Sequence, residues 1–443
     1  MLHLRAPCHG ILLNCNNLFV QEVLILFLRG SQLTRFSRLR EEFSFIRGNV
    51  LVLASTWIFV NLIAAIPLTY YPKYVEGLGG TPFIVGVIGF ASFAILALVQ
   101  FPGGYLADRH GRKWLTVAMT FGVAATYTFY VFAPSWQFIF VGAILLSLCS
   151  IYQPAIVALM ADSIPPEKRG IGYSVFTLTA YASVPSPIIA GLLSIRYGLI
   201  FGMRIAYSIV AISFVAAAFM RIKIKETLEN EKEKMSLQEA LRTFPNSVKE
   251  SLKALTNAPR SMFFLFFSFA IFNFAWYLGY LNMIFYATEV LHIKEFEWAI
   301  LMTWFSAVSF LSALPCGSII DKIGRKKPLW VAWLLFMPSM IIFLVGNIIL
   351  LYVCFLLLGL ASTILFTVYP ALQADLVARE NRGKIAGSTF FFFYILNSLG
   401  QLFGGFIYQY VSAMLPFLLS AMLYIPCFLL TLFLVHEPTK KET

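Results

Sequence analysis

The chain has 443 residues, of which 59% are hydrophobic and only 12% are charged, and its formal net charge is +12. Soluble domains usually carry about 25% charged residues, so this composition excludes an ordinary soluble protein and indicates an integral membrane protein. The basic excess does not indicate nucleic-acid binding, because that function needs a basic face on a soluble domain and none is visible.

The sequence lacks the motifs that would indicate an enzyme or a cofactor site. Its six cysteines show no close C-x-x-C spacing, and neither H-E-x-x-H nor the phosphate-binding G-x-x-x-x-G-K-[ST] occurs. No nucleophile, base and metal ligands form a visible cluster. We therefore expect no catalysis, no metal, no ATP binding and no cofactor, while a coupling ion such as H+ or Na+ stays open.

Residues 1–48 precede the first long apolar run. The apolar stretch 18–28 is too short to span a bilayer and contains Gln21 and Glu22. It lacks a convincing small-residue cleavage site, so it does not resemble a secretory signal. We expect either a cytoplasmic segment with a surface helix or a stretch that comes from a misassigned start codon.

Twelve apolar runs follow in two sets of six, each near the roughly 20 residues that a bilayer-spanning helix needs. Lipid offers the backbone no hydrogen-bond partners, so these runs should be helices, and they lack the alternation of barrel strands. The expected fold is an all-α membrane protein with two six-helix bundles, at 49–220 and 261–435. The predicted spans are 49–71, 83–106, 114–133, 137–160, 171–195, 202–220, 261–287, 298–320, 328–346, 349–373, 385–410 and 413–435.

The interval 221–260 between the two sets is polar and carries charges of both signs. The tetrapeptides SLQE and SVKE, which begin at Ser236 and Ser247, each match a helix capping box, and an apolar stripe runs through both. We expect two short amphipathic helices on the cytoplasmic membrane surface, which serve as a linker. Residues 436–443 form a polar cytoplasmic tail.

Lys and Arg are distributed unevenly between the two sides of the predicted spans. All but four of the 33 fall on one side, and the four exceptions are Lys73, Arg196, Arg204 and Lys294. Because basic loops stay in the cytoplasm, we expect the basic side and both termini to be cytoplasmic in a multi-pass protein of the cell membrane.

The string GGYLADRHGRK at 103–113 has a weaker copy, CGSIIDKIGRK, at 316–326. The same offset of 213 residues also relates the ends of the fourth and tenth spans. One offset kept over several loops indicates a duplicated six-helix unit, in which transporters place the solute site between the halves. The repeated pairs are Asp108 and Asp321, Gly111 and Gly324, Arg112 and Arg325, Asp162 and Asp375, and Arg169 and Arg382.

At these residues the sequence resembles the major facilitator superfamily. GGYLADRHGRK matches that family's signature between spans 2 and 3, roughly G-x-L-A-D-R-x-G-R-K, and the copy matches its weaker twin between spans 8 and 9. PPEKRG at 165–170 resembles the family's loop after span 4. The resemblance extends over about residues 49–435 and implies a secondary transporter that works by alternating access.

The charges of the repeated string predict a cytoplasmic gate. Asp108 ends span 2, where the helix dipole is already negative, so it needs a positive partner such as the start of span 11 after Arg382. By symmetry Asp321 should face the start of span 5, and the Arg and Asp residues of each half should pair. The predicted gate comprises Gly104, Asp108, Gly111, Arg112, Asp162, Arg169, Asp321, Gly324, Arg325, Asp375 and Arg382.

Asn and Gln are costly against lipid, so they mark the interior faces of spans. They are absent from the interiors of spans 3, 6, 9 and 12, which the resemblance places at the periphery. The predicted solute contacts are Asn61, Gln153, Asn273, Asn397 and Gln401, with aromatic walls from Trp57, Tyr152, Trp276, Tyr277 and Tyr369.

Two features of the spans bear on direction and coupling. SPIIAG at 186–191 resembles the family's G-P-x-x-G-G antiporter motif, with two glycines replaced, and its prolines permit a kink. No Asp or Glu is expected at mid-membrane depth, and span 4 lacks the arginine of many proton-coupled drug exporters in the family. Proton coupling would then use an end group such as Glu76, Glu289 or Glu297, or a carboxylate of the gate.

We interpret the chain as a monomeric secondary transporter of one small solute. The aromatic interior and the 186–191 motif favour export of amphipathic or aromatic compounds, as in multidrug exporters. The uncharged Asn and Gln set leaves open the uptake or facilitated diffusion of a neutral polar nutrient such as a sugar or organic acid. A nontransporting receptor or scaffold is disfavoured, because only a moving protein needs a breakable gate.

Overall fold

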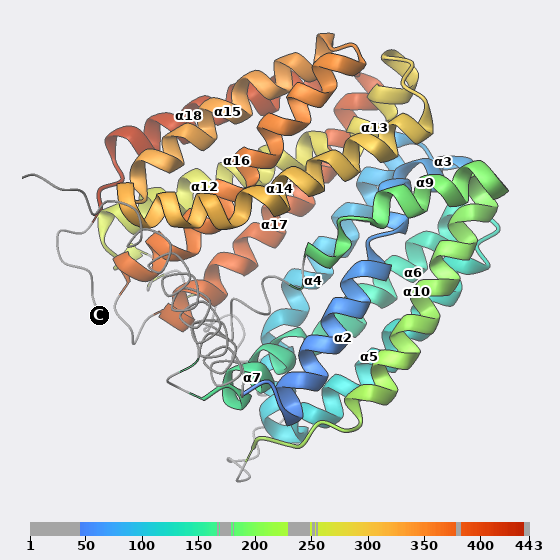
Figure 1. Cartoon of the computed structure of the whole chain (residues 1–443), viewed down its shortest axis with the longest axis vertical. Helices are drawn as coiled ribbons and strands as arrows, with labels where there is room; N and C mark the ends of the chain where they lie inside the picture. The colour runs from blue at the N-terminus through green and yellow to red at the C-terminus, as the bar shows by residue number, and fades with distance from the viewer. Residues whose placement is uncertain are drawn as a thin grey trace, which may run out of the picture.

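The computed structural model describes residues 45–165, 168, 179, 181–228, 249, 253, 256–377 and 382–437. In this part every regular element is a helix, and the helices form two bundles, one from each half of the chain (Figure 1). The described residues contain 11 helical runs that are long and apolar enough to cross a membrane. The fifth predicted span is described mainly from residue 181 onward. The all-α membrane fold with two bundles is therefore confirmed.

In the N-terminal bundle the helices of the second, third, fourth and sixth spans begin and end within a few residues of the predictions, while the first helix ends at Ala64, before the predicted end at 71. Span 4 is broken by a 3-10 turn at Ser150–Tyr152. Pro154, in the first turn of the following helix, has no N–H to continue the ladder of hydrogen bonds across this turn. The elements are α2 (Gly48–Ala64), η1 (Pro67–Thr69), α3 (Tyr71–Gly77), α4 (Pro82–His110), α5 (Arg112–Val131), α6 (Trp136–Cys149), η2 (Ser150–Tyr152), α7 (Gln153–Ser163), η4 (Tyr181–Ser183), α9 (Ser186–Tyr197) and α10 (Leu199–Arg221).

The C-terminal bundle repeats this arrangement. Its first span is also interrupted, by the 3-10 turn η5 and the π-helical turn η6. Turns of these kinds inside a membrane helix often mark functional positions. The elements are α12 (Arg260–Gly279), η5 (Tyr280–Asn282), α13 (Met283–Phe285), η6 (Tyr286–Val290), α14 (Glu295–Ile323), α15 (Lys326–Val345), α16 (Ile348–Leu376), α17 (Arg382–Tyr410) and α18 (Leu415–Phe433).

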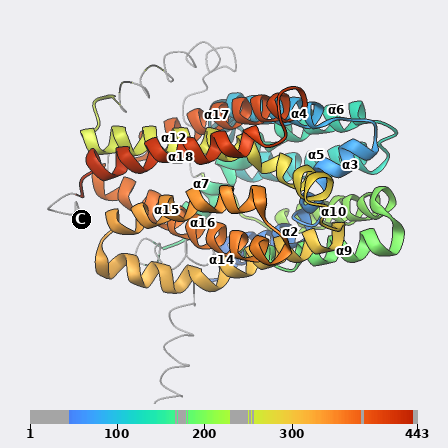
Figure 2. The same ribbon diagram turned by 90° about the horizontal axis from the view of Figure 1, so that it is seen from above.

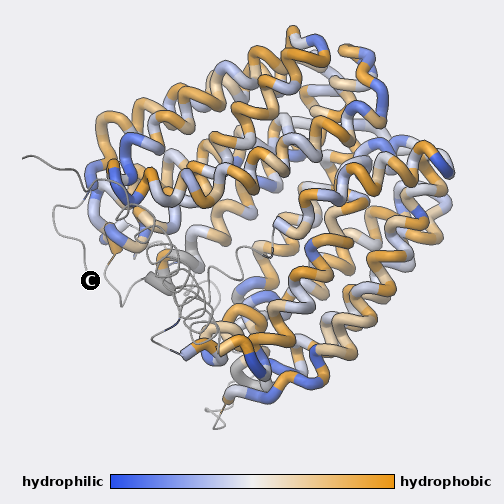
Figure 3. The backbone as a smooth tube through the Cα atoms, viewed as in Figure 1, coloured by the Kyte–Doolittle hydropathy of each residue, from blue (hydrophilic) through white to orange (hydrophobic). Residues whose placement is uncertain are grey.

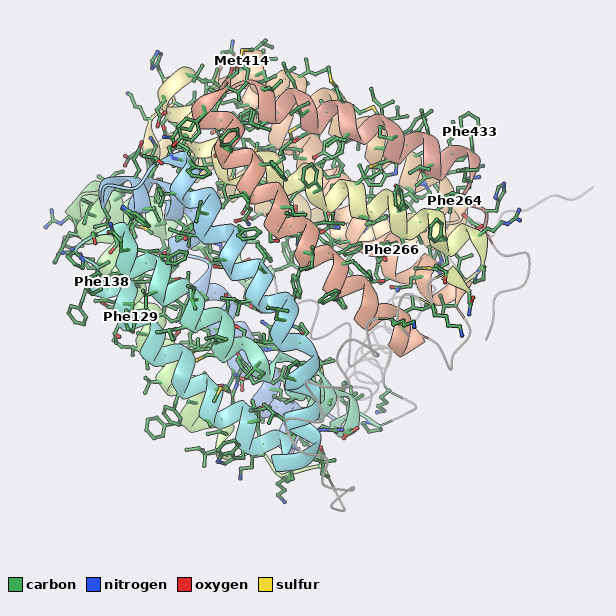
Figure 4. All side chains as sticks on the ribbon, turned by 180° about the vertical axis from the view of Figure 1, so that it is seen from behind. Phe129, Phe138, Phe264, Phe266, Met414 and Phe433 are labelled. Carbon is green, nitrogen blue, oxygen red and sulfur yellow. The ribbon has the colours of Figure 1, made fainter. Side chains whose placement is uncertain are left out.

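Apolar side chains cover the sides of both bundles as well as filling them. Figure 3 shows hydrophobic residues along the helices and hydrophilic residues gathered toward their ends. Figure 4 shows Phe138 at the outer edge of the N-terminal bundle, where 46% of it is exposed. Inside the C-terminal bundle, Trp333, Phe336 and Tyr424 are fully buried and their rings contact one another. An apolar exterior around a packed aromatic core suits a protein surrounded by lipid.

The bundles contact each other mainly through α4 with α17 and α9 with α14. Figures 1 and 2 show α4 and α17 side by side near the middle of the molecule, and Figure 1 shows their other ends diverging. We call the end that carries Lys73, Glu289 and Trp298 the closed end. The end that carries Arg112 and Arg325 is the open end.

Some predictions fall outside the described residues. They are the segment up to residue 44, the two linker helices, the last residues of the tail and Arg169. One boundary prediction is wrong: Arg221, which the sequence assigned to the polar linker, is the last residue of α10 and is only 1% exposed. Its side chain finds hydrogen-bond partners inside the bundle, so it does not need to reach water.

Candidate functional site

A cavity of about 150 Å³ lies between the two bundles, next to the closed end. The N-terminal bundle contributes η1, the start of α3, η4 and the start of α9, and the C-terminal bundle contributes α12, η5, α13, α14 and α16. Its walls are mostly apolar and aromatic, with a few hydroxyl groups. Residues that line it include Thr69, Ser183, Pro187, Trp276, Tyr280, Met283, Trp298, Ser306 and Phe355. An apolar pocket with few polar groups is typical of small-molecule sites.

Ionic and polar contacts between the bundles close the molecule beyond this cavity. Lys73 Nζ lies 2.6 Å from a Glu289 oxygen of the other bundle and 2.9 Å from a Glu76 oxygen of its own. The Trp298 indole N–H donates to the Thr69 carbonyl at 3.2 Å. These contacts join α3 and η1 to the C-terminal bundle and seal one end of the space between the bundles.

Tyr70 adds a further bond at this end, from its hydroxyl to the Glu295 carbonyl oxygen at 2.5 Å. Burial raises the pKa of the Tyr70 phenol, and the Glu295 carboxylate raises it further. The phenol therefore stays protonated and remains a donor at any physiological pH.

Glycines let α4 and α17 approach at backbone distance. A Cβ on Gly86 would lie 2.5 Å from the Gln401 carbonyl oxygen, and one on Gly405 would lie 2.7 Å from the Pro82 carbonyl oxygen. A Cβ on Gly89 would overlap the Gln401 side-chain amide. Small residues are the usual means of close helix contact in membranes.

The second inter-bundle contact, α9 with α14, follows the same principle. Gly191, the last residue of the SPIIAG segment, packs against Phe296 and Ala299, and a Cβ there would come within 2.9 Å of both side chains. Ser194 Oγ lies 3.1 Å from a Glu295 carboxylate oxygen. The segment that resembles the antiporter motif thus forms part of the contact between the bundles.

At the open end each bundle contains its own charge pair, and the two pairs are related by the repeat. Arg112 on α5 binds the Asp162 carboxylate of α7, and Arg325 at the start of α15 binds the Asp375 carboxylate of α16. The side chains of Arg325 and Asp375 are 17% and 18% exposed. Both pairs are the ones that the sequence predicted within each half.

The glycines that precede these arginines have positive φ, +91° at Gly111 and +88° at Gly324. Each also leaves space for a carboxylate from the segment after the sixth or twelfth span. Glu226 accepts a hydrogen bond from Lys113 N at 2.9 Å, and Glu437 accepts one from Arg325 N at 2.6 Å. These glutamates cap the first turns of α5 and α15, where the helix dipole favours negative charge.

The remaining predicted gate residues are only partly placed. Asp108 lies in the last turn of α4 and Arg382 begins α17, and the structure describes only their backbones. Asp321 is 74% exposed and lies 3.8 Å from Arg325, four residues along the chain. A Cβ on Gly104 would lie 4.0 Å from Pro154, so a side chain there would meet no close contact. The contact of Asp108 with the start of span 11 stays a prediction.

The predicted solute contacts separate into two groups. Trp276 lines the cavity, together with Tyr280, which the sequence analysis did not select. Asn397 and Gln401 are each 5% exposed, and Gln401 lies against α4 at the closed contact instead of in the cavity. A polar residue in a span predicts an interior face, but it does not tell a cavity wall from a helix contact.

The other predicted contacts also lie outside the described cavity. Asn273 donates to the Phe269 carbonyl of its own helix at 2.8 Å. The Tyr277 ring packs against Phe93 of α4, with ring centres 5.0 Å apart, and the Tyr369 ring lies 4.1 Å from that of Phe269. Gln153 accepts a weak hydrogen bond from Gln100 at 3.4 Å. Trp57 and Tyr152 pack against a cluster of α2 and α7, and Asn61 is half-buried on α2.

A family model described as Major Facilitator Superfamily matches residues 48–299 and 265–443, which covers both bundles. The chain belongs to the major facilitator superfamily. It is therefore a multi-pass membrane transporter of small molecules, and its two bundles are the halves of that fold. The recognition made from the repeated string is confirmed.

Curated relatives and solved structures agree with this membership. Multidrug resistance protein MdtG of Salmonella arizonae is 27% identical over 384 residues, which cover 82% of this chain and 88% of the relative. A Na(+), Li(+), K(+)/H(+) antiporter of Planococcus maritimus is 29% identical over 42% of each chain. A POT family transporter in complex with 5-aminolevulinic acid shares the fold with a TM-score of 0.70 at 13% identity, covering 86% of this chain and 95% of that one. A bacterial homolog of the human lysosomal transporter Spinster, in an inward-facing and unoccupied conformation, has a TM-score of 0.65 at 14% identity over 87% and 94%.

The closed end offers a direct test of its ion pair. We expect Glu289→Gln to loosen the closure, because among the described residues Glu289 is the one acidic residue of the C-terminal bundle that pairs with Lys73. A partly exposed pair contributes at most about 1 kcal/mol, so the shift should be about threefold. A cysteine at Thr69, which is 8% exposed, should react about threefold faster with a membrane-impermeant maleimide.

Glu297→Gln is the matched control. The Glu297 carboxylate accepts a hydrogen bond from Lys294 N at the start of its own helix at 3.0 Å, and among the described residues it forms no ion pair with the other bundle. Labelling at position 69 should stay at the parental rate in this variant. Equal acceleration by both substitutions would show that any lost charge loosens this end, and the specific role of Glu289 would be wrong.

Proposed function

We propose that this transporter exports amphipathic, aromatic-containing compounds, and that the structure represents its inward-facing state. The observation that carries the proposal is the aromatic cavity between bundles that are joined at one end and diverge at the other. A solute would enter from the open end, bind near Trp276 and Tyr280, and leave after the closed end separates. The relative named as a multidrug resistance protein supports this substrate class.

The orientation follows from charge. The open end carries the clusters of basic residues at the starts of α5 and α15, and the closed end carries few basic residues. By the positive-inside rule the open end is cytoplasmic, so in this proposal the solute enters from the cytoplasm. Both termini then lie on the cytoplasmic side.

Coupling to an ion is part of the proposal. The relative from Planococcus maritimus is named as an antiporter that exchanges cations for protons. Two carboxylates at the closed end, Glu76 and Glu289, are bound to Lys73. A proton taken up there would weaken the tie between the bundles, as opening toward the outside requires. No organic cofactor and no ATP enter this cycle.

The test is export of a neutral fluorescent amphipath, N-phenyl-1-naphthylamine. Cells that produce the chain should accumulate less dye than cells that produce the Gly86→Ile variant described below, and an ionophore that collapses ion gradients should abolish the difference. Equal accumulation, or saturable sugar counterflow in proteoliposomes, would contradict export of amphipathic compounds.

Asp108→Asn tests the predicted gate. We expect the variant to insert normally but to export the dye at least about tenfold more slowly, because the state closed toward the cytoplasm loses a charged contact at a helix start. Membrane content by immunoblot and dye export together measure this. Normal export by normally inserted protein would remove the gate role of Asp108.

A further inference from the structure

Arg221, the last residue of α10, carries a charge into the N-terminal bundle. It is 1% exposed and is among the largest fully buried side chains of the described chain. Side chains on a helix lean toward its N-terminus, and α10 ends at the open end. The guanidinium therefore points back into the bundle, away from the nearest aqueous surface.

Its partners in the bundle are neutral. Nη1 donates to the Thr120 hydroxyl of α5 at 2.7 Å, and Nε lies 3.4 Å from the Thr56 hydroxyl of α2. The guanidinium carbon lies 5.7 Å from the centre of the Tyr152 ring of η2. An arginine stays charged in proteins, so these contacts stabilise the cation without neutralising it.

The acidic residues closest to it along the chain and along span 4 have other partners. Glu226 caps α5 through Lys113 N, and Asp162 pairs with Arg112, ten residues beyond Tyr152 and about 15 Å along the helix. No described ion pair includes Arg221. A buried charge without a counter-ion is costly and usually functional in a membrane protein.

Tyr152 connects this charge to the bundle surface. It ends the 3-10 turn that divides span 4, and it is only half-buried, although it packs against three apolar clusters. The next residue, Gln153, is exposed and bonds to Gln100 of α4, the helix that meets α17. Figure 1 shows α7, which Gln153 begins, toward the open end and the other bundle.

We propose that Tyr152 and Gln153 form part of the wall of the solute path and that Arg221 gives this wall a fixed positive potential. The transporter therefore prefers amphipathic solutes with a negatively charged group, such as a carboxylate, over neutral or cationic ones. The solute meets this wall on the open-end side of the space between the bundles, before it reaches the cavity at Trp276 and Tyr280. This inference rests on the proposed function and names the charge of its substrate.

The test uses three ligands with one ring system: 2-naphthoate, 2-naphthamide and 2-naphthylmethylammonium. Their affinities for the purified full-length protein are measured by calorimetry. Two unit charges about 10 Å apart at an effective dielectric constant of about 20 change affinity about tenfold, so naphthoate should bind about tenfold more tightly than the amide, and the ammonium compound most weakly. Arg221→Gln should weaken naphthoate to the level of the amide and leave the amide unchanged.

Arg204→Gln is the matched control, because Arg204 lies on the same helix near the closed end and donates to the Ala133 carbonyl at 2.8 Å. It should keep the preference for naphthoate. Binding of all three compounds with equal affinity to the wild type would overturn this proposal alone, whether or not Arg221→Gln folds. Equal weakening of all three compounds by Arg221→Gln would also overturn this proposal and assign Arg221 a structural role. If the wild type binds none of the three compounds, the proposed function is overturned as well.

Discussion

A Gly86→Ile substitution is expected to slow transport by about thirtyfold or more while the protein still inserts. Gly86 packs against the Gln401 carbonyl oxygen and the Gly405 backbone across the α4–α17 contact. A bulky side chain there meets backbone, which cannot rotate away, and overpacking of this kind costs about 2 kcal/mol or more, or about thirtyfold in the population of the joined state. The measurement is N-phenyl-1-naphthylamine export, normalised to the amount of inserted protein.

Ala125→Ile controls for added bulk in a membrane helix. Ala125 lies on the exposed face of α5, so its substitution should leave export near the parental rate. If the Gly86 variant also exports normally, α4 and α17 do not need close contact during the cycle, and the arrangement of the bundles described above would be incidental to transport.

We expect Arg325→Gln to slow transport at least about tenfold, because it leaves the partly buried Asp375 carboxylate without its ion-pair partner. Asp375→Asn should also be harmful, since it leaves the Arg325 guanidinium with only the exposed Asp321 carboxylate, at 3.8 Å. The double variant, Arg325→Gln with Asp375→Asn, should transport faster than expected if the effects of the two single substitutions on transport were independent. The reason is that neither charge is then left without its partner.

Lys327→Gln is the control that separates the loss of the Arg325–Asp375 ion pair from the loss of a positive charge that orients the protein in the membrane. Lys327 belongs to the same basic cluster, in the first turn of α15, and is exposed, so it contributes to orientation without a buried partner. Its replacement should leave export unchanged. Strictly additive losses in the double variant, or an equal loss in Lys327→Gln, would contradict a specific role for the Arg325–Asp375 pair.

Much of the fold is predictable from the sequence because lipid imposes one simple constraint. A backbone in lipid must be helical, so apolar runs mark the helices, and α14 and α15 begin and end within three residues of the predicted 298–320 and 328–346. The pairing of Arg112 with Asp162 is also predictable, because the repeat shows the same two residue types at matching places in the other half.

Tertiary features of the site are less predictable. Trp298 and Thr69 seal the cavity through one indole–carbonyl bond between segments 229 residues apart, which no local pattern indicates. The position of Lys73 could have indicated an ion pair at this end, since it is one of few basic residues on its side of the spans. Tyr280 lines the cavity from a 3-10 turn, and the continuous apolar run of this span gives no indication that the helix is interrupted there.

Arg221 shows where a rule based on position fails. A basic residue at the end of an apolar run normally belongs to a loop, because the charge prefers water. Here the end of α10 is surrounded by α2 and α5, and the hydroxyls of Thr56 and Thr120 replace water. Whether Arg221 is a linker residue or a charge inside the bundle therefore depends on the direction of its side chain, which the sequence does not indicate.

The most direct test of the rocking of two halves is a pair of spin-label distances, measured by electron–electron double resonance in liposomes on a variant without its six native cysteines. One pair joins the open ends at Lys223 and Lys322, and the other joins the closed ends at Phe132 and Val345, all of which are exposed. We predict that Glu289→Gln lengthens the closed-end distance and shortens the open-end distance in the same sample. A closed-end distance that changes while the open-end distance stays fixed would contradict rigid halves that alternate access.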